Sequence, residues 1–209
     1  MTVGAERERS VHHLDHDSRR AGAEPFLRPS FSRTNRLARG AWMLVESTVF
    51  RFSPRAFFGW RRLLLRVFGA KLGERCHIHR RVRIWAPWNL HCEDLVTLAD
   101  EVVVYNPSLV FLATHSIVSQ QAYLCGAGHD YTQPAFPMIS APIRIGAYAW
   151  IGARAVVQMG VTVGERSILA LGAIATRDIE PWTIYAGVPA RKLKDRPPFP
   201  AAGGLTPVR

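Results

Sequence analysis

The chain has 209 residues, which is enough for one domain or for a domain with an extension, and 48% of them are hydrophobic, which is enough for a hydrophobic core. No run of 18 or more uncharged apolar residues occurs, and the first 40 residues lack an apolar segment of signal-peptide type, so we expect neither a membrane-spanning helix nor a secretory leader. The odd number of cysteines and their lack of paired spacing predict reduced thiols in a cytoplasmic protein, without a disulfide framework or zinc site; they are Cys76, Cys92 and Cys125.

The formal net charge of +11 is concentrated in the N-terminal third of the chain. Residues 1–71 contain 14 Lys and Arg against 6 Asp and Glu, whereas residues 72–209 contain 13 against 10. Such an excess is compatible with nucleic acid, with an anionic membrane surface or with simple solubility. No nucleic-acid-binding motif accompanies it, so we place nucleic acid last among these partners.

Residues 1–35 mix charged residues, histidine and proline without periodicity, which predicts a disordered basic tail. His12, His13 and His16 form either a metal site or part of a flexible polar tail, and the tail is the commoner explanation.

Two amphipathic helices are expected within residues 36–70. The first shows helical spacing between Leu37 and Phe52. The second has Ser53 as N-cap, Pro54 at its first position and Gly69 at its end. Two compatible roles remain open for these basic helices: covering the end of the following domain, or attachment to an anionic membrane surface.

Residues 71–180 repeat with a period of six, which fits neither a 3.6-residue helix nor a long two-residue alternation. The period predicts a solenoid of short flat strands, in which each aliphatic side chain points inward and small residues allow the chain to turn. The clearest positions, each six residues after the last, are Ile145, Ile151, Val157, Val163, Leu169 and Ala175.

The same register extends back to Leu72, with two steps of eight residues and one interruption. The two extra residues in each longer step, near Leu90–His91 and Val110–Phe111, are expected to form small bulges at corners. Residues 126–142 then interrupt the register with three prolines and several polar residues, which predicts an excursion loop. Long loops within regular scaffolds are usually functional.

The repeats end before residues 181–209, for which we expect a turn region, a short C-terminal helix over residues 191–194 and a frayed tail from residue 197.

These segments resemble the colanic acid biosynthesis acetyltransferase branch of the hexapeptide-repeat acyltransferases. The resemblance spans about residues 40–194 and includes IWAPWNL (84–90), GHDY (128–131), AWIG (149–152) and YAGVPARKLK (185–194). The N-terminal FRFSPRAFFGWRRLLLRVFGAKLG (50–73) is also similar to that branch. Hexads alone indicate a fold, whereas the GHDY loop together with the AGVPAR ending is far more specific.

The resemblance implies an all-β fold, a left-handed parallel β-helix with about three hexads per turn. Members are typically homotrimers with active sites between adjacent subunits, and they transfer an acetyl group from acetyl-CoA, without a metal, to a hydroxyl of a sugar or another small acceptor. We therefore expect an acetyl-CoA-dependent O-acetyltransferase of exopolysaccharide or related glycan biosynthesis. A lipid-linked acceptor at the cytoplasmic membrane face would account for the basic, aromatic helices.

His129 matches the catalytic base of the family. Acetyl transfer to an alcohol needs a group that accepts the hydroxyl proton near neutral pH, which suits imidazole, and Gly126 and Gly128 let the backbone approach a ligand. Asn106 matches a position that faces the acceptor or the reacting carbonyl, although an amide there would equally cap a turn. Second-rank candidates for binding the acceptor or holding His129 are Tyr105, Asp130 and Tyr131.

The resemblance also implies a cofactor site. Trp150 would line the acetyl and pantetheine channel or pack at a trimer interface, and the two roles are compatible. Pantetheine would run along Ala153, Leu171 and Thr176. Candidates for the CoA phosphates are Arg177, Arg191 and Lys194, for which plain solvated side chains are the alternative.

Two other functions stay open. A carbonic-anhydrase-like zinc hydratase on the same coil would need three histidine ligands, and the spacing of His79, His91, His115 and His129 does not resemble that class. A non-catalytic scaffold would use the coil only for assembly with partners. His115 itself stands at an unusual place in its hexad, and we expect it to be a corner residue.

Overall fold

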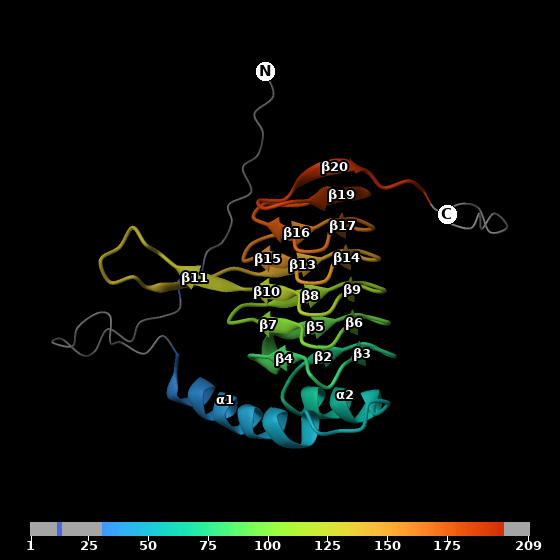
Figure 1. The fold of residues 1–209 in the computed structure, drawn as a ribbon. Coiled ribbons are helices and arrows are strands. Elements are labelled where there is room, and N and C mark those ends of the chain that lie inside the picture. Colours follow the sequence, from blue (N-terminus) through green and yellow to red (C-terminus); the bar gives the residue numbers. More distant parts are fainter. Residues whose placement is uncertain (1–11, 14–30, 199–209) are drawn as a thin grey trace.

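The computed structural model describes residues 12–13 and 31–198, and the second of these segments forms a three-sided solenoid closed at one end by helices (Figure 1). The helical segment comprises α1 (Arg33–Val45), a π-helical turn η2 (Glu46–Phe50) and α2 (Phe58–Val67). The two predicted helices are therefore present. Helix α2 begins later than expected, because Ser53 does not cap it: its hydroxyl instead donates to the Phe50 carbonyl.

Three sheets of mainly parallel strands form the sides of the solenoid, and each turn contributes one strand to each sheet. The first sheet contains β2 (Lys71–Leu72), β5 (Leu90–Cys92), β8 (Val110–Leu112), β13 (Ile143–Ile145) and β16 (Thr162–Val163). The second contains β3 (His77–Ile78), β6 (Thr97–Leu98), β9 (Ile117–Val118), β14 (Trp150–Ile151), β17 (Ile168–Leu169), β19 (Thr183–Ala186) and β20 (Arg191–Asp195). The third contains β4 (Arg83–Ile84), β7 (Val103–Tyr105), β10 (Tyr123–Cys125), β15 (Val156–Gln158) and β18 (Ile174–Ala175).

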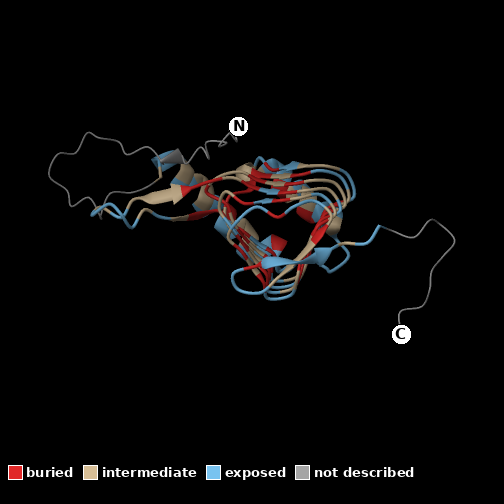
Figure 2. Ribbon diagram, turned by 90° about the horizontal axis from the view of Figure 1, so that it is seen from above, coloured by how far each residue is buried: buried red, intermediate tan, exposed pale blue. Residues whose placement is uncertain are grey.

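The hexad positions form the core. Figure 2 looks along the coil and shows the triangular cross-section with its buried interior. The register between turns aligns each inward aliphatic with its equivalent in the next turn, as in the column Ile84, Val104, Leu124, Val157 and Ala175. Every member of that column is buried, so the period of six does place one side chain inside at every strand.

The two longer steps are also present, although their extra residues lie before the strands and not within them. A short 3-10 helix, η3 (Pro87–Asn89), precedes β5, and residues 106–109 form the equivalent corner before β8. The pairs expected to bulge, Leu90–His91 and Val110–Phe111, instead sit in regular ladders of the first sheet. Proline at the start of each insertion removes a donor that the ladder would need, so the insertion falls at the corner.

One corner of the triangle carries a vertical stack of aromatic and cationic side chains. In each turn the residue between the first and second sheets has a positive φ, which costs an L-residue about 1–2 kcal/mol. The His115 and Tyr148 rings stack at 4.5 Å between centroids, and the Arg166 guanidinium lies 4.7 Å from both the Tyr148 and the Trp182 ring centroids. These contacts offset part of the backbone strain. His115, with φ of 59°, is a corner residue as expected.

Side chains of the helices form hydrogen bonds with backbone groups at the open edge of the first turn. Trp42 Nε1 donates to the Ile84 carbonyl at 2.6 Å, and a Glu46 carboxylate oxygen accepts from the Ile84 N–H at 2.8 Å. Burial raises the pKa of the Glu46 carboxyl. An unpaired backbone group at this buried position would cost about 1–3 kcal/mol, so the two side chains replace the missing neighbouring strand.

Arginine side chains likewise donate hydrogen bonds to backbone carbonyls of the neighbouring strands. The Arg61 guanidinium is fully buried and donates to the carbonyls of Ile78, Pro54 and Arg55 and to the Ser53 hydroxyl. Further donors to edge carbonyls are Arg62, to Cys76, and Arg66, to Leu72 and Gly73. All three basic residues of α2 therefore cap the coil.

The opposite end of the coil differs from the prediction. Residues 191–194 were expected to begin a short helix, yet they lie in β20 (Arg191–Asp195), which pairs antiparallel with β19 and covers the last parallel edge. Pairing with an otherwise open edge outweighs the weak helical preference of a five-residue segment. No described helix is long and apolar enough to cross a membrane.

The expected tails lie mostly outside the described residues. Of the residues predicted to be disordered, 1–11 and 14–30 are not described, while His12–His13 form the short strand β1 and α1 begins at Arg33. His16 and residues 199–209 likewise lie outside the described part of the chain.

We predict that Arg61→Met lowers the free energy of unfolding by about 3 kcal/mol, because it leaves several buried acceptors without their donor. Arg33→Met, at an exposed position of α1, serves as the matched control and is expected to change stability by less than about 0.5 kcal/mol. Denaturant unfolding of both variants measures the difference, and equal midpoints would contradict the capping role.

Candidate functional site

The expected excursion loop is an antiparallel hairpin that leaves the coil directly after β10. Its strands are β11 (Ala127–His129) and β12 (Met138–Ser140), with His129 opposite Met138, and β12 also pairs with β1. Figure 1 shows the hairpin projecting from the side of the solenoid. At its foot, the Gly126 N–H donates to the Tyr105 carbonyl at 2.7 Å. A Cβ at Gly126 would lie 2.7 Å from that same oxygen, so only glycine fits this close approach.

The hairpin fixes the orientation of the His129 imidazole. Nδ1 lies 2.8 Å from the Phe136 carbonyl oxygen, and the two rings stack at 4.7 Å between centroids with 7° between their planes. A carbonyl can only accept, so Nδ1 must carry the proton. In the neutral ring Nε2 then holds the lone pair, and the His129 side chain is exposed. The arrangement presents a proton acceptor to a molecule at the surface.

The tip of the hairpin holds the two neighbouring candidates. The Asp130 carboxylate accepts from the Thr132 N–H and hydroxyl and from the Gln133 side-chain amide, so it shapes the turn. Tyr131 is 84% exposed and can meet another molecule. Asp130 thus positions the tip, whereas the Tyr131 side chain is accessible to an acceptor molecule.

Tyr105 lies at the foot of the hairpin on the outer side of the third sheet. Its ring stands edge-on to Trp85, with 5.7 Å between centroids. Burial, together with the nearby Cys125 thiol, raises the pKa of the Tyr105 phenol. The Arg39 guanidinium lies over the Trp85 ring, 3.8 Å from its centroid. The sequence had offered Tyr105 alone, and the structure adds Trp85 and Arg39 beside it.

Asn106 does not fit the catalytic role proposed for it. The residue is fully buried, its Oδ1 accepts from the Ala86 N–H at 3.0 Å, and its Nδ2 donates to the Ala86 carbonyl at 2.8 Å. Both ends of the amide are therefore engaged with one backbone segment. Asn106 ties together two corners of successive turns, which was the alternative for this position.

The cofactor candidates lie elsewhere on the coil. Trp150 is 46% exposed on the second sheet and donates through Nε1 to the Ser119 hydroxyl. Ala153 and Leu171 are stacked at the next corner in successive turns, where the Gly172 N–H donates to the Ala153 carbonyl. The remaining candidates lie near the C-terminal end of the coil: Thr176 and Arg177 after β18, and Arg191 and Lys194 on β20.

Within one chain, His129 and Trp150 lie on different faces of the coil. His129, Asp130 and Tyr131 belong to the hairpin, which leaves the third sheet. Trp150 belongs to the second sheet, and Figure 1 shows β14 and β17 on the side of the coil away from the hairpin. The structure therefore does not bring His129 and Trp150 together within a single chain, whereas Thr176 and Arg177 follow β18 in the same sheet that the hairpin leaves.

Sequence reasoning missed the Phe136 contact that orients His129. The acceptor is a backbone carbonyl, and any residue at position 136 would supply one, so no sequence signal marks it. Met159, whose methyl lies 3.3 Å from the place of a Cβ on Gly128, was missed for a similar reason, because it contacts the hairpin from the following turns.

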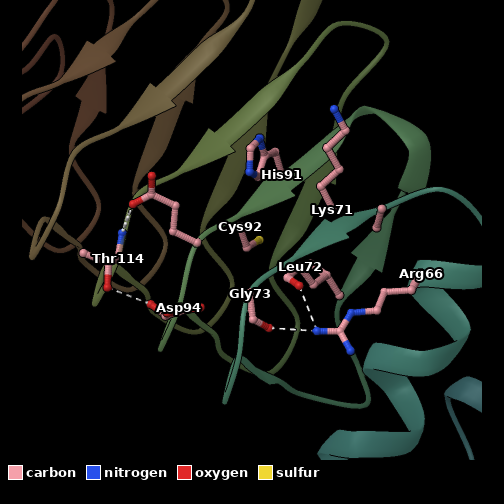
Figure 3. Close-up of a pocket in the computed structure, with 10 residues that line it drawn as sticks. Arg66, Lys71, Leu72, Gly73, His91, Cys92, Asp94 and Thr114 are labelled. Carbon is pink, nitrogen blue, oxygen red and sulfur yellow. Dashed lines mark hydrogen bonds between the residues drawn. The ribbon is translucent and has the colours of Figure 1, made fainter.

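A large cavity near the N-terminal end of the coil is separate from all of these residues. It has a volume of about 730 Å³ and lies over the first sheet. Figure 3 shows Arg66 reaching the Leu72 and Gly73 carbonyls at one side of it, with Lys71 and His91 nearby. Its charges are of both signs and are largely committed to backbone groups, as for Arg66 and for Asp94, which accepts from the Glu74 N–H. We assign no function to this cavity.

The histidines proposed for the zinc alternative are dispersed. His91 stands edge-on to Phe111 on the first sheet, His115 lies in the corner stack, and His79 lies 3.6 Å from Asp100 at another corner. Among residues 12–13 and 31–198, no group of three or more His, Cys, Asp or Glu side chains could hold a metal ion. No observation favours the hydratase.

Comparisons with known proteins agree with the resemblance noted in the sequence. No protein-family profile matches the chain. The chain is 32% identical over 155 residues to the putative colanic acid biosynthesis acetyltransferase of Escherichia coli, covering 74% of this chain and 85% of that protein. It is also 32% identical over 125 residues to the galactoside O-acetyltransferase of the same organism, covering 59% of this chain and 55% of the relative.

Solved structures share the fold. A hexapeptide-repeat acetyltransferase of Vibrio cholerae, complexed with acetyl-CoA, superimposes with a TM-score of 0.72 at 23% identity, covering 81% of this chain and 93% of that one. A galactoside acetyltransferase in complex with coenzyme A gives a TM-score of 0.70 at 23% identity, covering 80% and 84%. The solenoid is therefore the left-handed parallel β-helix that the sequence resemblance implied.

We predict that Gly126→Ala lowers the free energy of unfolding by about 1–3 kcal/mol, because the new methyl group meets the rigid Tyr105 carbonyl. Gly128→Ala is the matched control, since its methyl group meets only the flexible end of Met159, and it should cost less than about 1 kcal/mol. Denaturant titration compares the two variants. An unchanged free energy of unfolding in Gly126→Ala would show that the foot of the hairpin can shift.

Proposed function

The chain belongs to the hexapeptide-repeat acetyltransferase family, and we propose that it transfers the acetyl group of acetyl-CoA to a sugar hydroxyl with His129 as general base. The observation that carries the proposal is the Nδ1 contact with the Phe136 carbonyl, which leaves Nε2 of an exposed imidazole as the proton acceptor. A histidine in this tautomer is suited to activate an alcohol near neutral pH.

The proposed reaction follows from that geometry. Nε2 of His129 removes the proton of the acceptor hydroxyl as its oxygen attacks the thioester carbonyl. The tetrahedral intermediate then collapses, its C–S bond breaks, and the coenzyme A thiolate leaves. The protonated His129 returns the proton to that sulfur, so the base is regenerated and no metal is required.

Acetyl-CoA is the proposed co-substrate because structurally similar proteins were solved with acetyl-CoA or coenzyme A. We propose that Trp150 and the stacked corner residues Ala153 and Leu171 line the pantetheine path, with Thr176 following. Exposed cations at the C-terminal end of the coil are candidates for the phosphates: Arg177, Arg191 and Lys194. Lys192 is less suited, since its ammonium group already pairs with Glu180 and Asp195.

A homotrimer with sites between subunits would bring His129 of one subunit close to Trp150 of the next. The hairpin base and Trp150 lie on different faces of one chain, so a single acetyl-CoA would need the hairpin of one subunit and the second sheet of another. Exposed apolar side chains on that sheet, Ile117 and Trp150, supply contact surface for a neighbouring coil.

The proposed acceptor is a sugar unit of an exopolysaccharide or related glycan, carried on a lipid at the cytoplasmic membrane face. Two relatives are named for colanic acid biosynthesis and for galactoside acetylation, which supports a carbohydrate hydroxyl as the acceptor class. Tyr131 lies two residues after His129 at the hairpin tip, Tyr105 lies at the hairpin foot, and aromatic side chains pack well against sugar rings.

We predict that His129→Ala lowers kcat/KM for acetyl transfer by about 10²- to 10⁴-fold, because the hydroxyl then loses its proton acceptor. His77→Ala, at an exposed position of the second sheet, is the matched control and should retain activity. Thiol release from acetyl-CoA across a panel of sugars measures both. Unaltered turnover in the His129 variant would rule it out as the base and would favour a different base, whereas a parent chain without turnover on any sugar would favour the scaffold.

We further predict that inactive His129→Ala and Trp150→Ala chains complement each other when co-expressed. If each site takes His129 from one subunit and Trp150 from the next, random mixing in a trimer restores about a quarter of the parental activity. The same thiol-release assay on the mixed oligomer provides the readout. Absence of any recovery, with mixed trimers verified by dual affinity tags, would place both residues in one chain's site.

A further inference from the structure

The helices at the N-terminal end of the coil leave a large apolar surface uncovered. Among the described residues, nine of the seventeen exposed large hydrophobic side chains lie within residues 37–67. We call these nine the basal surface: Leu37, Met43, Leu44, Val49, Phe52, Phe57, Trp60, Leu63 and Val67. Phe52, Val67 and Leu44 are 78%, 72% and 68% exposed. Exposed apolar side chains gathered on one end of a domain usually mark an interaction site.

A hollow in the basal surface offers apolar contact almost exclusively. It has a volume of about 490 Å³, and its walls include Val49, Phe52, Phe57 and Trp60. The polar atom of Trp60 is already engaged, because Nε1 donates to the Val49 carbonyl at 3.1 Å. The Ser53 hydroxyl beside it donates to the Phe50 carbonyl. An occupant that needs hydrogen bonds would find few partners here, whereas a hydrocarbon chain would fit.

The charge of these helices is predominantly positive. Residues 47–73 contain five arginines and one lysine and no acidic residue. Arg61, Arg62 and Arg66 donate to backbone carbonyls of the coil, while Arg51 and Arg55 are exposed beside the hollow. The acidic side chain nearest in sequence, Glu46, accepts from the Ile84 N–H. The basal surface is therefore apolar with a cationic border.

We infer that the basal surface docks on an anionic phospholipid membrane, with α1 and α2 lying in the plane of the interface. Apolar side chains beside exposed arginines match the acyl region and the anionic headgroups of such a membrane. A second copy of this surface would instead oppose arginine with arginine. No described helix is long enough to cross a bilayer, which agrees with binding parallel to its plane.

This inference deepens the proposed function, on which it rests for the lipid-linked acceptor. Parallel coils in the proposed trimer would direct three basal surfaces toward the same membrane, so weak individual contacts would add. Binding to lipid can nevertheless be measured without acetyl-CoA or acceptor. The outcome is therefore independent of whether acetyl transfer is observed.

The test is sedimentation of the full chain with vesicles of phosphatidylglycerol and phosphatidylethanolamine, against phosphatidylcholine alone. We expect preferential binding to the anionic vesicles that weakens as salt increases. Phe52→Ser with Phe57→Ser should weaken it by about tenfold or more, since both side chains are exposed and their burial in lipid would be lost. Arg51→Glu with Arg55→Glu should weaken it by about tenfold or more through charge alone.

Leu193→Ser is the control, because this leucine is 65% exposed on β20 at the opposite end of the coil, and it should bind vesicles like the parent (Figure 1). Absence of binding to anionic vesicles at low salt would overturn the inference. So would equal binding by the parent and the double phenylalanine variant. Ultracentrifugation supplies the competing outcome: self-association abolished by the phenylalanine substitutions, without lipid binding, would assign the basal surface to a second copy.

Discussion

The hydrogen bonds between successive turns impose the rest of this structure. Each short strand pairs in parallel register with the strands of the turns before and after it, so the chain must return to the same place at every turn. A side chain that points inward in one turn then lies above an inward side chain of the preceding turn. The inward side chains together form a buried column of aliphatic residues. Additional residues can be accommodated only at corners, where η3 and the His129 hairpin are found.

That requirement explains why the two ends of the coil look unlike its middle. The first turn has no preceding strand, and the helices meet its backbone with Trp42, Glu46 and buried Arg61. The last parallel strand receives β20 as an antiparallel cover. Basic residues that looked surface-directed in the sequence are partly structural, and those left over border the apolar base.

The periodic part of the fold could be predicted from the sequence because its cause is local and repeated. Hexad spacing placed each inward residue correctly from Leu72 to Ala175, and glycine with proline marked the excursion. The strand at residues 191–195 could not be predicted in this way, since its conformation depends on an open edge formed by distant residues. The sequence left two roles open for Asn106 because a buried and an exposed amide look alike in sequence, and the carbonyl that orients His129 is a backbone group that any residue would supply.

Substitutions in the corner stack are expected to depend on one another. The stack consists of His115, Tyr148, Arg166 and Trp182. Glycine at position 148 would relieve the positive φ, yet it would also remove the ring that His115 and Arg166 both contact. The effect of a substitution at one level therefore depends on which residues occupy the levels above and below. Along this edge we expect stability effects to be non-additive between adjacent turns, so that neighbouring corner residues change in concert over evolution.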